Sequence, residues 1–306
     1  MRRGALRRGM LAAVAAGLGA LALAAGATAT PALAAGATAT PFPPPALEQL
    51  IGQLYVSPGI DPPGANNWSC KPSAAHPYPV VLVHGTLFDK TLTWNLMAPV
   101  LEHAGYCVFA LDYGSRGTQE IAQSAVELKA FIQRVLQATG SARVDLVGHS
   151  QGGMMPRYYI KFLGGAAHVH DLIGLAPSNH GTTNPLAAPL GQYADCVACT
   201  EQVAGSPFLA KLNAGDQTPP PVNYTVIETS HDEIVTPYQS AFLPPEGGRV
   251  TNVLLQDDCP LDLSEHVAIT DDPVAIQWVL NALSSNGPAD PTFKPDCTGL
   301  SLLASL

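Results

Sequence analysis

Short apolar runs alternate with longer amphipathic segments over most of this 306-residue chain. Continuous apolar runs are typical of strands that are buried on both faces of a parallel sheet. They occupy residues 79–83, 107–111, 144–147, 171–175, 222–227 and 249–255. Apolar positions spaced by three or four predict a long helix at residues 118–140, and further helices are expected at 93–103, 151–163 and 271–283. This alternation predicts a doubly wound α/β fold, with a mostly parallel central sheet and helices on both faces.

Local signals set some of the expected limits. Thr118 is the expected N-cap of the long second helix, and Gly140 its end. Asp272 and Pro273 fit the N-cap and first position of the last helix. Residues 176–221 are long, irregular and rich in Gly, Pro and Asn, with one helix expected at 201–213. Loops of this length are uncommon unless they are functional, so we expect a lid-like insertion here.

The N-terminal region is expected to lie outside the fold. Residues 1–34 combine four arginines, an apolar run and an Ala-Leu-Ala site, which predicts a secretory signal peptide rather than a membrane anchor. The pair Arg7 and Arg8 leaves export by the twin-arginine route as an alternative to the general route. Residues 35–78 are predicted to form a spacer and a surface-wrapping segment, and residues 79–306 the main domain, for a secreted, extracellular protein.

The charge balance excludes some partners. The formal charge is −9, and the four arginines are the only charged residues before Glu48, so the mature chain would carry −13. An acidic surface argues against nucleic acid or anionic membrane as a partner. A composition that is 47% hydrophobic and 13% charged suits an ester or lipid substrate instead. We expect a monomer that touches a lipid–water interface only transiently.

The cysteines predict disulfides. Their number is even, which in an exported chain favours a disulfide framework with 15 possible pairings. They are Cys70, Cys107, Cys196, Cys199, Cys259 and Cys297. Cys196 and Cys199 also have the spacing of a redox or zinc pair, but the chain has no second C-x-x-C, so a small loop staple is the better interpretation.

Residues 148–152 read Gly-His-Ser-Gln-Gly and fit the G-x-S-x-G nucleophile elbow. Glycine at both ends removes two Cβ atoms that would clash in so tight a turn, which lets Ser150 sit strained and exposed. A pattern with three fixed positions also fits an ordinary Gly-Ser turn. The strand before it and the helix after it favour the elbow.

A serine nucleophile needs a base and an acid that orients the base, and in this fold they follow it in the order acid, then histidine. His266 comes after the last predicted strand and is the candidate base. Asp232 lies just past the strand 222–227 and is the preferred acid. Glu233 is its main rival, and Asp257 with Asp258, which otherwise fit a solvated turn, come third.

Two backbone N–H groups must face the oxyanion of such a reaction. One belongs to Gln151, after the serine, and the other to Thr86, after the first strand; the Thr86 hydroxyl offers a third hydrogen bond. No metal site is expected, since His168 and His170 show no partners in the sequence. No dinucleotide fingerprint appears either, so we expect no cofactor.

Four segments together resemble the secreted class 2 triacylglycerol lipases of the α/β-hydrolase superfamily. They are Val-Leu-Val-His-Gly-Thr at 81–86, Gly-His-Ser-Gln-Gly-Gly at 148–153, Pro-Ser-Asn-His-Gly-Thr at 177–182 and His-Asp-Glu-Ile-Val-Thr-Pro at 231–237. The resemblance implies an α/β-hydrolase fold and a catalytic set of Ser150, Asp232 and His266, with Thr86 and Gln151 at the oxyanion. Similarity to fungal lipase B further suggests Cys70–Cys107 and Cys259–Cys297 disulfides, which leaves Cys196 with Cys199.

The expected function is that of a secreted serine hydrolase, a lipase or carboxylesterase that cleaves esters of lipids through an acyl-enzyme. A cutinase or polyester depolymerase would use the same residues, and only the width of the cleft separates the two. A non-catalytic binding protein on the same fold is less favoured, because such a protein has no need of all five candidate residues.

Overall fold

The computed structural model describes residues 59–306 apart from 194, 246–248, 301 and 303–306. The expected signal peptide at 1–34 and residues 35–58 of the expected spacer segment lie outside the described residues. Within the described part, no helix is both long and apolar enough to cross a membrane.

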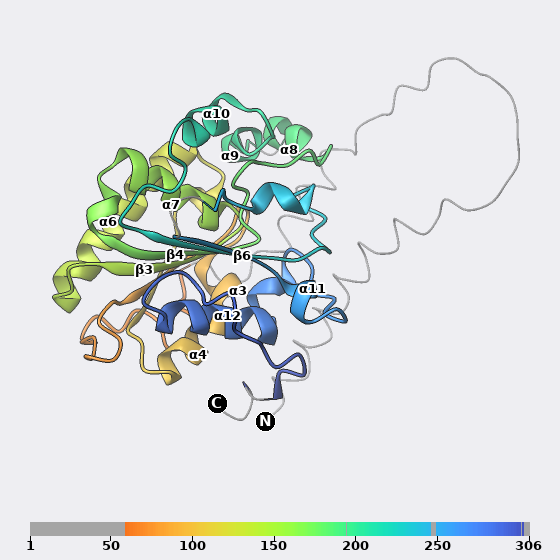
Figure 1. Cartoon of the computed structure of the whole chain (residues 1–306). Helices are drawn as coiled ribbons and strands as arrows, with labels where there is room; N and C mark the ends of the chain where they lie inside the picture. The colour runs from red at the N-terminus through yellow and green to blue at the C-terminus, as the bar shows by residue number, and fades with distance from the viewer. Residues whose placement is uncertain (1–58, 194, 246–248, 301, 303–306) are drawn as a thin grey trace, which may run out of the picture. The chain divides into compact units, whose positions relative to one another are not determined.

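Six parallel strands form the sheet, in the order β2-β1-β3-β4-β5-β6. They are β1 (Val80–Val83), β2 (Val108–Leu111), β3 (Val144–His149), β4 (Val169–Leu175), β5 (Asn223–Glu228) and β6 (Val250–Leu254). All six expected strands are confirmed. In a parallel sheet the carboxyl ends of the strands meet at one edge, so residues that follow β1, β3, β5 and β6 come together there (Figure 1).

Helices cover both faces of the sheet. The helices of the described residues are α3 (Lys90–Trp94), α4 (Met97–His103), α5 (Gly114–Gly117), α6 (Ile121–Thr139), α7 (Gln151–Phe162), α8 (Ala187–Tyr193), α9 (Val197–Glu201), α10 (Pro207–Asn213), α11 (Leu255–Asp258) and α12 (Pro273–Ser284). α6 and α7 lie on one face, and α3, α4 and α12 lie on the other (Figure 1).

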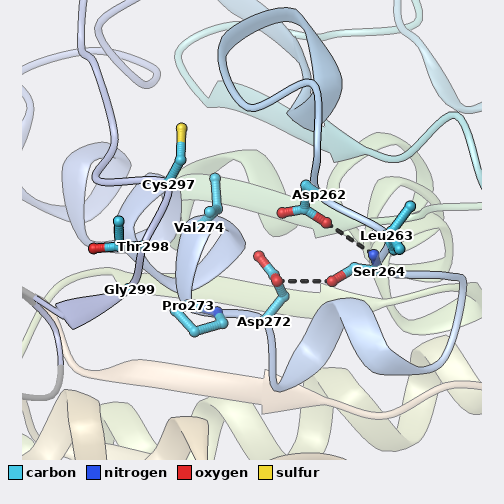
Figure 2. A pocket seen from close by; sticks show the side chains of 9 residues that line it. All are labelled: Asp262, Leu263, Ser264, Asp272, Pro273, Val274, Cys297, Thr298 and Gly299. Atoms are coloured by element: carbon cyan, nitrogen blue, oxygen red, sulfur yellow. Dashed lines mark hydrogen bonds between the residues drawn. The ribbon is translucent and has the colours of Figure 1, made fainter.

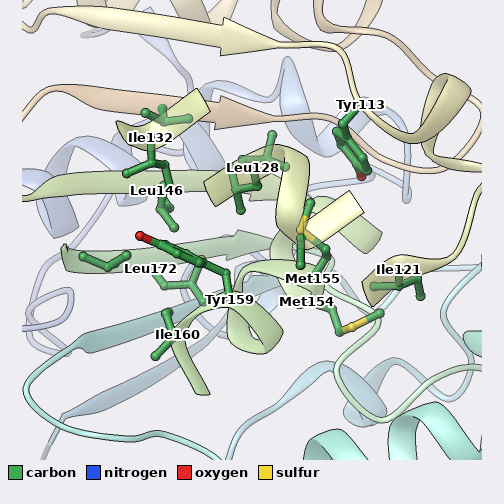
Figure 3. Packing of buried hydrophobic residues seen from close by; sticks show 14 of the residues in the cluster. Tyr113, Ile121, Leu128, Ile132, Leu146, Met154, Met155, Tyr159, Ile160 and Leu172 are labelled. Carbon is green, nitrogen blue, oxygen red and sulfur yellow. The ribbon is translucent and has the colours of Figure 1, made fainter. Parts of the chain in front are cut away.

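The alternation of side chains along the strands builds two cores. Val81 and Val83 of β1 face α6 and α7, whereas Val80 and Leu82 face the other layer. Figure 3 shows the first core, in which side chains from α6, α7 and the central strands interdigitate. β1, β2, β3 and β5 are buried on both faces, as the continuous apolar runs predicted, whereas the edge strand β6 is only partly buried and exposes Asn252.

The predicted helix at 93–103 is wrong in one respect, because the structure has two helices there. α3 ends at Trp94 and α4 starts at Met97. Pro99 explains the break: its ring would clash with the carbonyl of residue 95 in a continuous helix, and it has no N–H to donate. In the first turn of a new helix neither matters, so the chain restarts before the proline.

The expected cap of the long helix is also wrong. α6 begins at Ile121, and the Thr118 hydroxyl donates to Ser115 O instead. The free N–H of Ile121 donates to the Glu201 carboxylate, 2.7 Å away, which comes from α9. A carboxylate at a helix N-terminus is stabilised by the unpaired N–H groups and the helix dipole. This contact ties the insertion at 176–221 to the body of the fold.

The insertion holds α8, α9 and α10 rather than one helix at 201–213. α9 ends at Glu201, and Gly205 (φ +81°) then takes a left-handed conformation. α10 starts afresh at Pro207, with the Ser206 hydroxyl accepting from Leu209 N. Pro207 at the first helical position is compatible with a start but not with the middle of a helix.

Three disulfides are present, Cys70–Cys107, Cys196–Cys199 and Cys259–Cys297. These are the pairings that the resemblance suggested. The second closes the first turn of α9, so neither thiol is free to bind zinc in this structure.

Candidate active site

Ser150 occupies a strained turn between β3 and α7. Its backbone has φ +54° and ψ −122°, a conformation that costs a non-glycine residue of the order of 1–3 kcal/mol. Ser150 N donates to Leu175 O of β4 at 2.9 Å, which fixes the turn to the sheet. The expectation of an exposed serine is wrong, because Ser150 is only 7% exposed among the surrounding loops. The strand, the sharp turn and the helix are the context that a nucleophile elbow requires.

The two glycines of the motif are required by close backbone contacts. A Cβ at Gly148 would overlap with the carbonyl of Gly152, and a Cβ at Gly152 would overlap with the carbonyl oxygens of Val83 and His84. None of these neighbours is a flexible side-chain tip. The turn is therefore sterically closed to any larger residue at either position.

The structure pairs His266 with Asp232. The Nδ1 atom of His266 lies 2.7 Å from Oδ2 of Asp232, and both side chains are almost fully buried. Nδ1–H therefore donates to the carboxylate, which leaves Nε2 to accept a proton from another group. Asp232 follows β5, and His266 follows β6 and α11, so two loops at the carboxyl edge of the sheet supply the pair.

The Asp232 carboxylate is held ionised. Burial on its own would raise the pKa of Asp232, but hydrogen bonds from His266 and from the backbone N–H groups of Val235 and Ile234 lower it below its usual value. Glu233, its rival in the sequence, is exposed. Asp258, among the third candidates, pairs with Lys294 instead.

His149 joins the serine turn to the loop of the histidine. Its Nε2–H donates to the backbone oxygen of His266 at 2.8 Å, and the two imidazole centroids are 4.9 Å apart. Burial and the neighbouring His266 lower the pKa of His149 to about 3, so its ring stays neutral. Because His149 directly precedes Ser150, this bond brings the His266 loop to the elbow.

The loop before His266 has further anchors. Ser264 N donates to Asp262 Oδ1, and Ser264 Oγ donates to Asp272 Oδ2 (Figure 2). These residues line a cavity of about 260 Å³, whose other wall includes Cys297. Asp272 also caps α12 by accepting from Ala275 N, so the loop is attached to a long helix.

The two expected oxyanion residues lie beside the elbow. Gln151 is the first residue of α7, so its backbone N–H lies outside the helical hydrogen-bond ladder. Gly85, which precedes Thr86, packs so tightly on the turn that a Cβ there would lie 3.1 Å from Cβ of Ser150. The helix N-terminus at Gln151 also carries the positive end of the helix dipole, which favours a negative charge nearby.

Tyr113 and Gln202 support this region, and sequence reasoning did not identify either. Tyr113, in the loop after β2, donates its hydroxyl to His84 O at 2.7 Å and accepts from Gln151 Nε2 at 3.0 Å. Gln202 lies at the end of α9 and contacts both Thr86 and Gln151. No local motif marks a tertiary contact between loops, so the sequence held no signal for either residue.

One group of metal-ligating side chains exists among the described residues, at the opposite end of the sheet. His170 has partners after all, since its Nδ1 lies 3.0 Å from Asp145 Oδ1 and 3.3 Å from Asp171 Oδ2. Burial alone would lower the pKa of His170, but the two carboxylates raise it to about 10. With Nδ1 protonated, the imidazolium forms an ion pair with the two carboxylates.

The strand order and the serine turn after β3 are those of the α/β-hydrolase fold. The crystal structure of Aspergillus fumigatus lipase B superposes on it with a TM-score of 0.64 at 21% identity, covering 80% of this chain and 59% of that one. The mature form of a Bacillus licheniformis lipase gives a TM-score of 0.54 at 19% identity, over 69% of this chain and 94% of the other. At these identities the similarity concerns the fold.

Residues 77–279 match the family described as Lipase (class 2), and the chain belongs to this family. Triacylglycerol lipases are among its relatives: one from Pseudarthrobacter phenanthrenivorans is 36% identical over 97 residues, 28% of each chain. Another, from Pseudomonas fragi, is 30% identical over 160 residues, 46% of this chain and 50% of the relative. The matches therefore span between about a quarter and a half of these relatives.

Proposed function

We propose that this protein is a secreted serine hydrolase that cleaves the carboxylic esters of lipids through an acyl-enzyme. In this proposal Ser150 is the nucleophile, His266 the base and Asp232 the acid that orients it. The observation that carries the proposal is the 2.7 Å contact between Asp232 and His266, whose loop is bound to the elbow by His149. Family membership supports the same class of reaction.

In the first half-reaction, Ser150 Oγ attacks the carbonyl carbon of the ester while His266 Nε2 takes the serine proton. The carbonyl electron pair moves onto its oxygen, and the N–H groups of Thr86 and Gln151 donate to it. Collapse breaks the bond to the alkoxy oxygen, and His266 returns the proton to the leaving alcohol. The acyl group remains on Ser150.

In the second half-reaction, a water molecule attacks the acyl carbon while His266 takes one of its protons. Collapse of the second tetrahedral intermediate breaks the bond to Ser150 Oγ, which recovers its proton from His266. The products are an alcohol and a carboxylic acid. Asp232 stays ionised throughout and stabilises the imidazolium that forms twice in each cycle.

Exposed apolar side chains near these residues support a lipid substrate. Ile234 follows the Asp232 turn, and Val267 directly follows His266; both are large, apolar and exposed. Leu186 is also exposed, and its segment is tied to the Asp232 turn, since Asn184 Nδ2 donates to Glu233 O at 2.8 Å. An apolar rim of this kind suits contact with an acyl chain or a lipid surface.

The test compares wild type with Ser150→Ala on chromogenic esters of increasing chain length and on an emulsified triglyceride. We expect Ser150→Ala to lower kcat by about 10⁶-fold. Unchanged turnover in Ser150→Ala would refute the proposal. Preference for short soluble esters would identify an esterase, and release of acid from a polyester film without triglyceride cleavage would support the polymer-degrading alternative.

Secretion is part of the proposal. Three disulfides suit an oxidising compartment, and residues 1–34 have the pattern of a signal peptide. The mass of the protein recovered from culture medium would test this, with an N-terminus near residue 35 as the expected result. Light scattering on the same sample would test the expected monomer.

A further inference from the structure

Gln202 lies between the two residues that are proposed to hold the oxyanion. It comes from the end of α9 in the insertion, and it is 8% exposed. Its Nε2 donates to Thr86 Oγ1 at 2.9 Å and, over a longer 3.4 Å, to Gln151 Oε1. The side chain therefore joins the insertion, the loop after β1 and the start of α7.

The hydrogen bonds of the Gln202 amide fix which end faces Thr86. Nε2 also lies 3.1 Å from the backbone oxygen of Ala198, and a carbonyl oxygen can only accept. The other end, Oε1, accepts from the Ser178 hydroxyl at 2.7 Å. In a flipped amide, Oε1 of Gln202 would face the backbone oxygen of Ala198, and neither atom can donate. The atom that contacts Thr86 must therefore be Nε2.

This orientation determines what the Thr86 hydroxyl can do. A hydroxyl has one proton to donate and two lone pairs to accept. Since Thr86 Oγ1 accepts from Gln202, its own proton is available for a different acceptor. We propose that Gln202 is a positioning residue that aims the Thr86 hydroxyl proton at the oxyanion of the tetrahedral intermediate.

α9, which carries Gln202 at its end, is short but is held by several contacts. The disulfide Cys196–Cys199 closes the first turn of α9, and Ala198 N donates to Thr118 O. Glu201 accepts from Ile121 N, as described above. The carbonyl of Gln202 itself accepts from Thr182 N at 2.9 Å. Hydrogen bonds thus attach α9 to the start of α6 and its end to Thr182.

The inference rests on the proposed function, because Gln202 touches Thr86 and not the reacting atoms. Loss of one oxyanion donor typically lowers kcat by 10²–10³-fold. A hydroxyl that is merely freed to rotate keeps part of its effect. We therefore expect Gln202→Ala to lower kcat by about 10-fold, with KM within about twofold of wild type, since the interaction is strengthened only in the transition state.

The experiment is a double-mutant cycle of Gln202→Ala and Thr86→Val, with kcat and KM measured on a soluble short-chain ester. If Gln202 acts through the Thr86 hydroxyl, Gln202→Ala will lower kcat less than twofold in the Thr86→Val background. A merely structural role predicts the same 10-fold loss in both backgrounds. Losses that multiply, or a Gln202→Ala variant with full kcat, would overturn the proposal.

Two further variants complete the test. Gln277→Ala is the matched control, because Gln277 Nε2 also donates to acceptors within the fold, but these are the backbone oxygens of Pro273 and Asp296 and not a residue of the proposed site; we expect wild-type kcat. If Gln202→Ala fails to fold, Gln202→Glu keeps the shape and turns the donor into an acceptor for the Thr86 proton, so kcat must still fall. Full activity of a folded Gln202→Glu would refute the positioning role, while loss of activity in Ser150→Ala would leave the proposed function intact.

Discussion

His266 Nδ1 lies 2.7 Å from Asp232 Oδ2, and the other carboxylate oxygen, Oδ1, accepts from the N–H groups of Ile234 and Val235. The two oxygens therefore have different partners. A carboxylate held at both oxygens cannot rotate away from the imidazole. The turn that follows β5 thus fixes the direction in which His266 presents its Nε2.

Replacement of Asp232 by asparagine tests this relationship. An amide at this position keeps the size of the side chain but removes the charge, and its NH₂ group favours the wrong imidazole tautomer. We expect Asp232→Asn to lower kcat by about 10⁴-fold. Glu233→Gln is the matched control on the neighbouring, exposed residue, with kcat expected within about twofold of wild type. Comparable losses in the two variants would contradict the assignment.

Substitution of Gly152 tests the steric basis of the elbow. A Cβ there would overlap with the carbonyl oxygens of Val83 and His84, so Gly152→Ala must displace β1 or α7. We expect a loss of about 1–3 kcal/mol or more in the free energy of unfolding, together with loss of activity. Gly287→Ala serves as the control, because its Cβ would enter open space. Denaturant unfolding measures both, and equal stabilities would refute the argument.

The disulfides are expected to differ in effect. Cys70–Cys107 links residues 37 positions apart, whereas Cys196–Cys199 spans three. On loop-closure entropy, their removal costs about 4 and about 2 kcal/mol. Activity should follow the opposite order: Cys196→Ser/Cys199→Ser loosens α9 and lowers kcat several-fold, while Cys70→Ser/Cys107→Ser changes it little below its melting temperature. A Cys70 pair with the larger effect on kcat would contradict this prediction.

The ion pair at the far end of the sheet predicts a pH dependence of stability. The pKa of His170 rises from 6.5 to about 10 in the folded protein. Because the pKa of His170 is higher in the folded than in the unfolded protein, its protonation stabilises the folded state. This stabilisation is complete below pH 6.5 and is lost as the pH rises towards 10. Burial also raises the pKa of Asp171, and that of Asp145 to about 7, which makes stability fall with rising pH in the same direction.

The measurement is the difference in Tm between wild type and the uncharged variant Asp145→Asn/His170→Gln/Asp171→Asn. We expect the Tm of wild type to fall by several degrees relative to that of the variant between pH 6.5 and pH 10. The variant controls for every other titrating group, since it lacks only these three. A difference that stays constant across this interval would show that the three groups do not act together.

The strands and the elbow could be predicted because their signals are local. A continuous apolar run such as 144–147 is buried on both faces in the structure. The G-x-S-x-G spacing is also local, although only Gly148 is required by a contact inside the turn, whereas Gly152 is required by the end of β1 and His84. The fold class followed from the alternation of such runs with helices. The chain order of nucleophile, acid and base then limited the candidates to very few.

Some misses arose where distant residues decide. Thr118 is a good N-cap by type, but Glu201, which lies 80 residues beyond Ile121, accepts from the N–H of Ile121 instead. The break between α3 and α4 is different, because Pro99 is a local signal that the predicted helix at 93–103 did not take into account. Gln202 belongs to no motif, and only folding brings its amide to Thr86. Contacts between residues that are far apart in the sequence cannot be predicted from the spacing of residues in a single sequence.

The two parts of the proposed site differ in their expected stability against local unfolding. Ser150 directly follows β3, which is fully buried, whereas the Gln202 amide that contacts Thr86 lies at the end of a five-residue helix. Regions with fewer buried contacts open at lower free energy than the central strands. On warming, turnover should therefore decline while the far-UV circular dichroism is still native, and amide hydrogens of α9 should exchange before those of β3. Cooling from this temperature range should restore the rate, because the central sheet stays folded and α9 can pack against the same neighbours again.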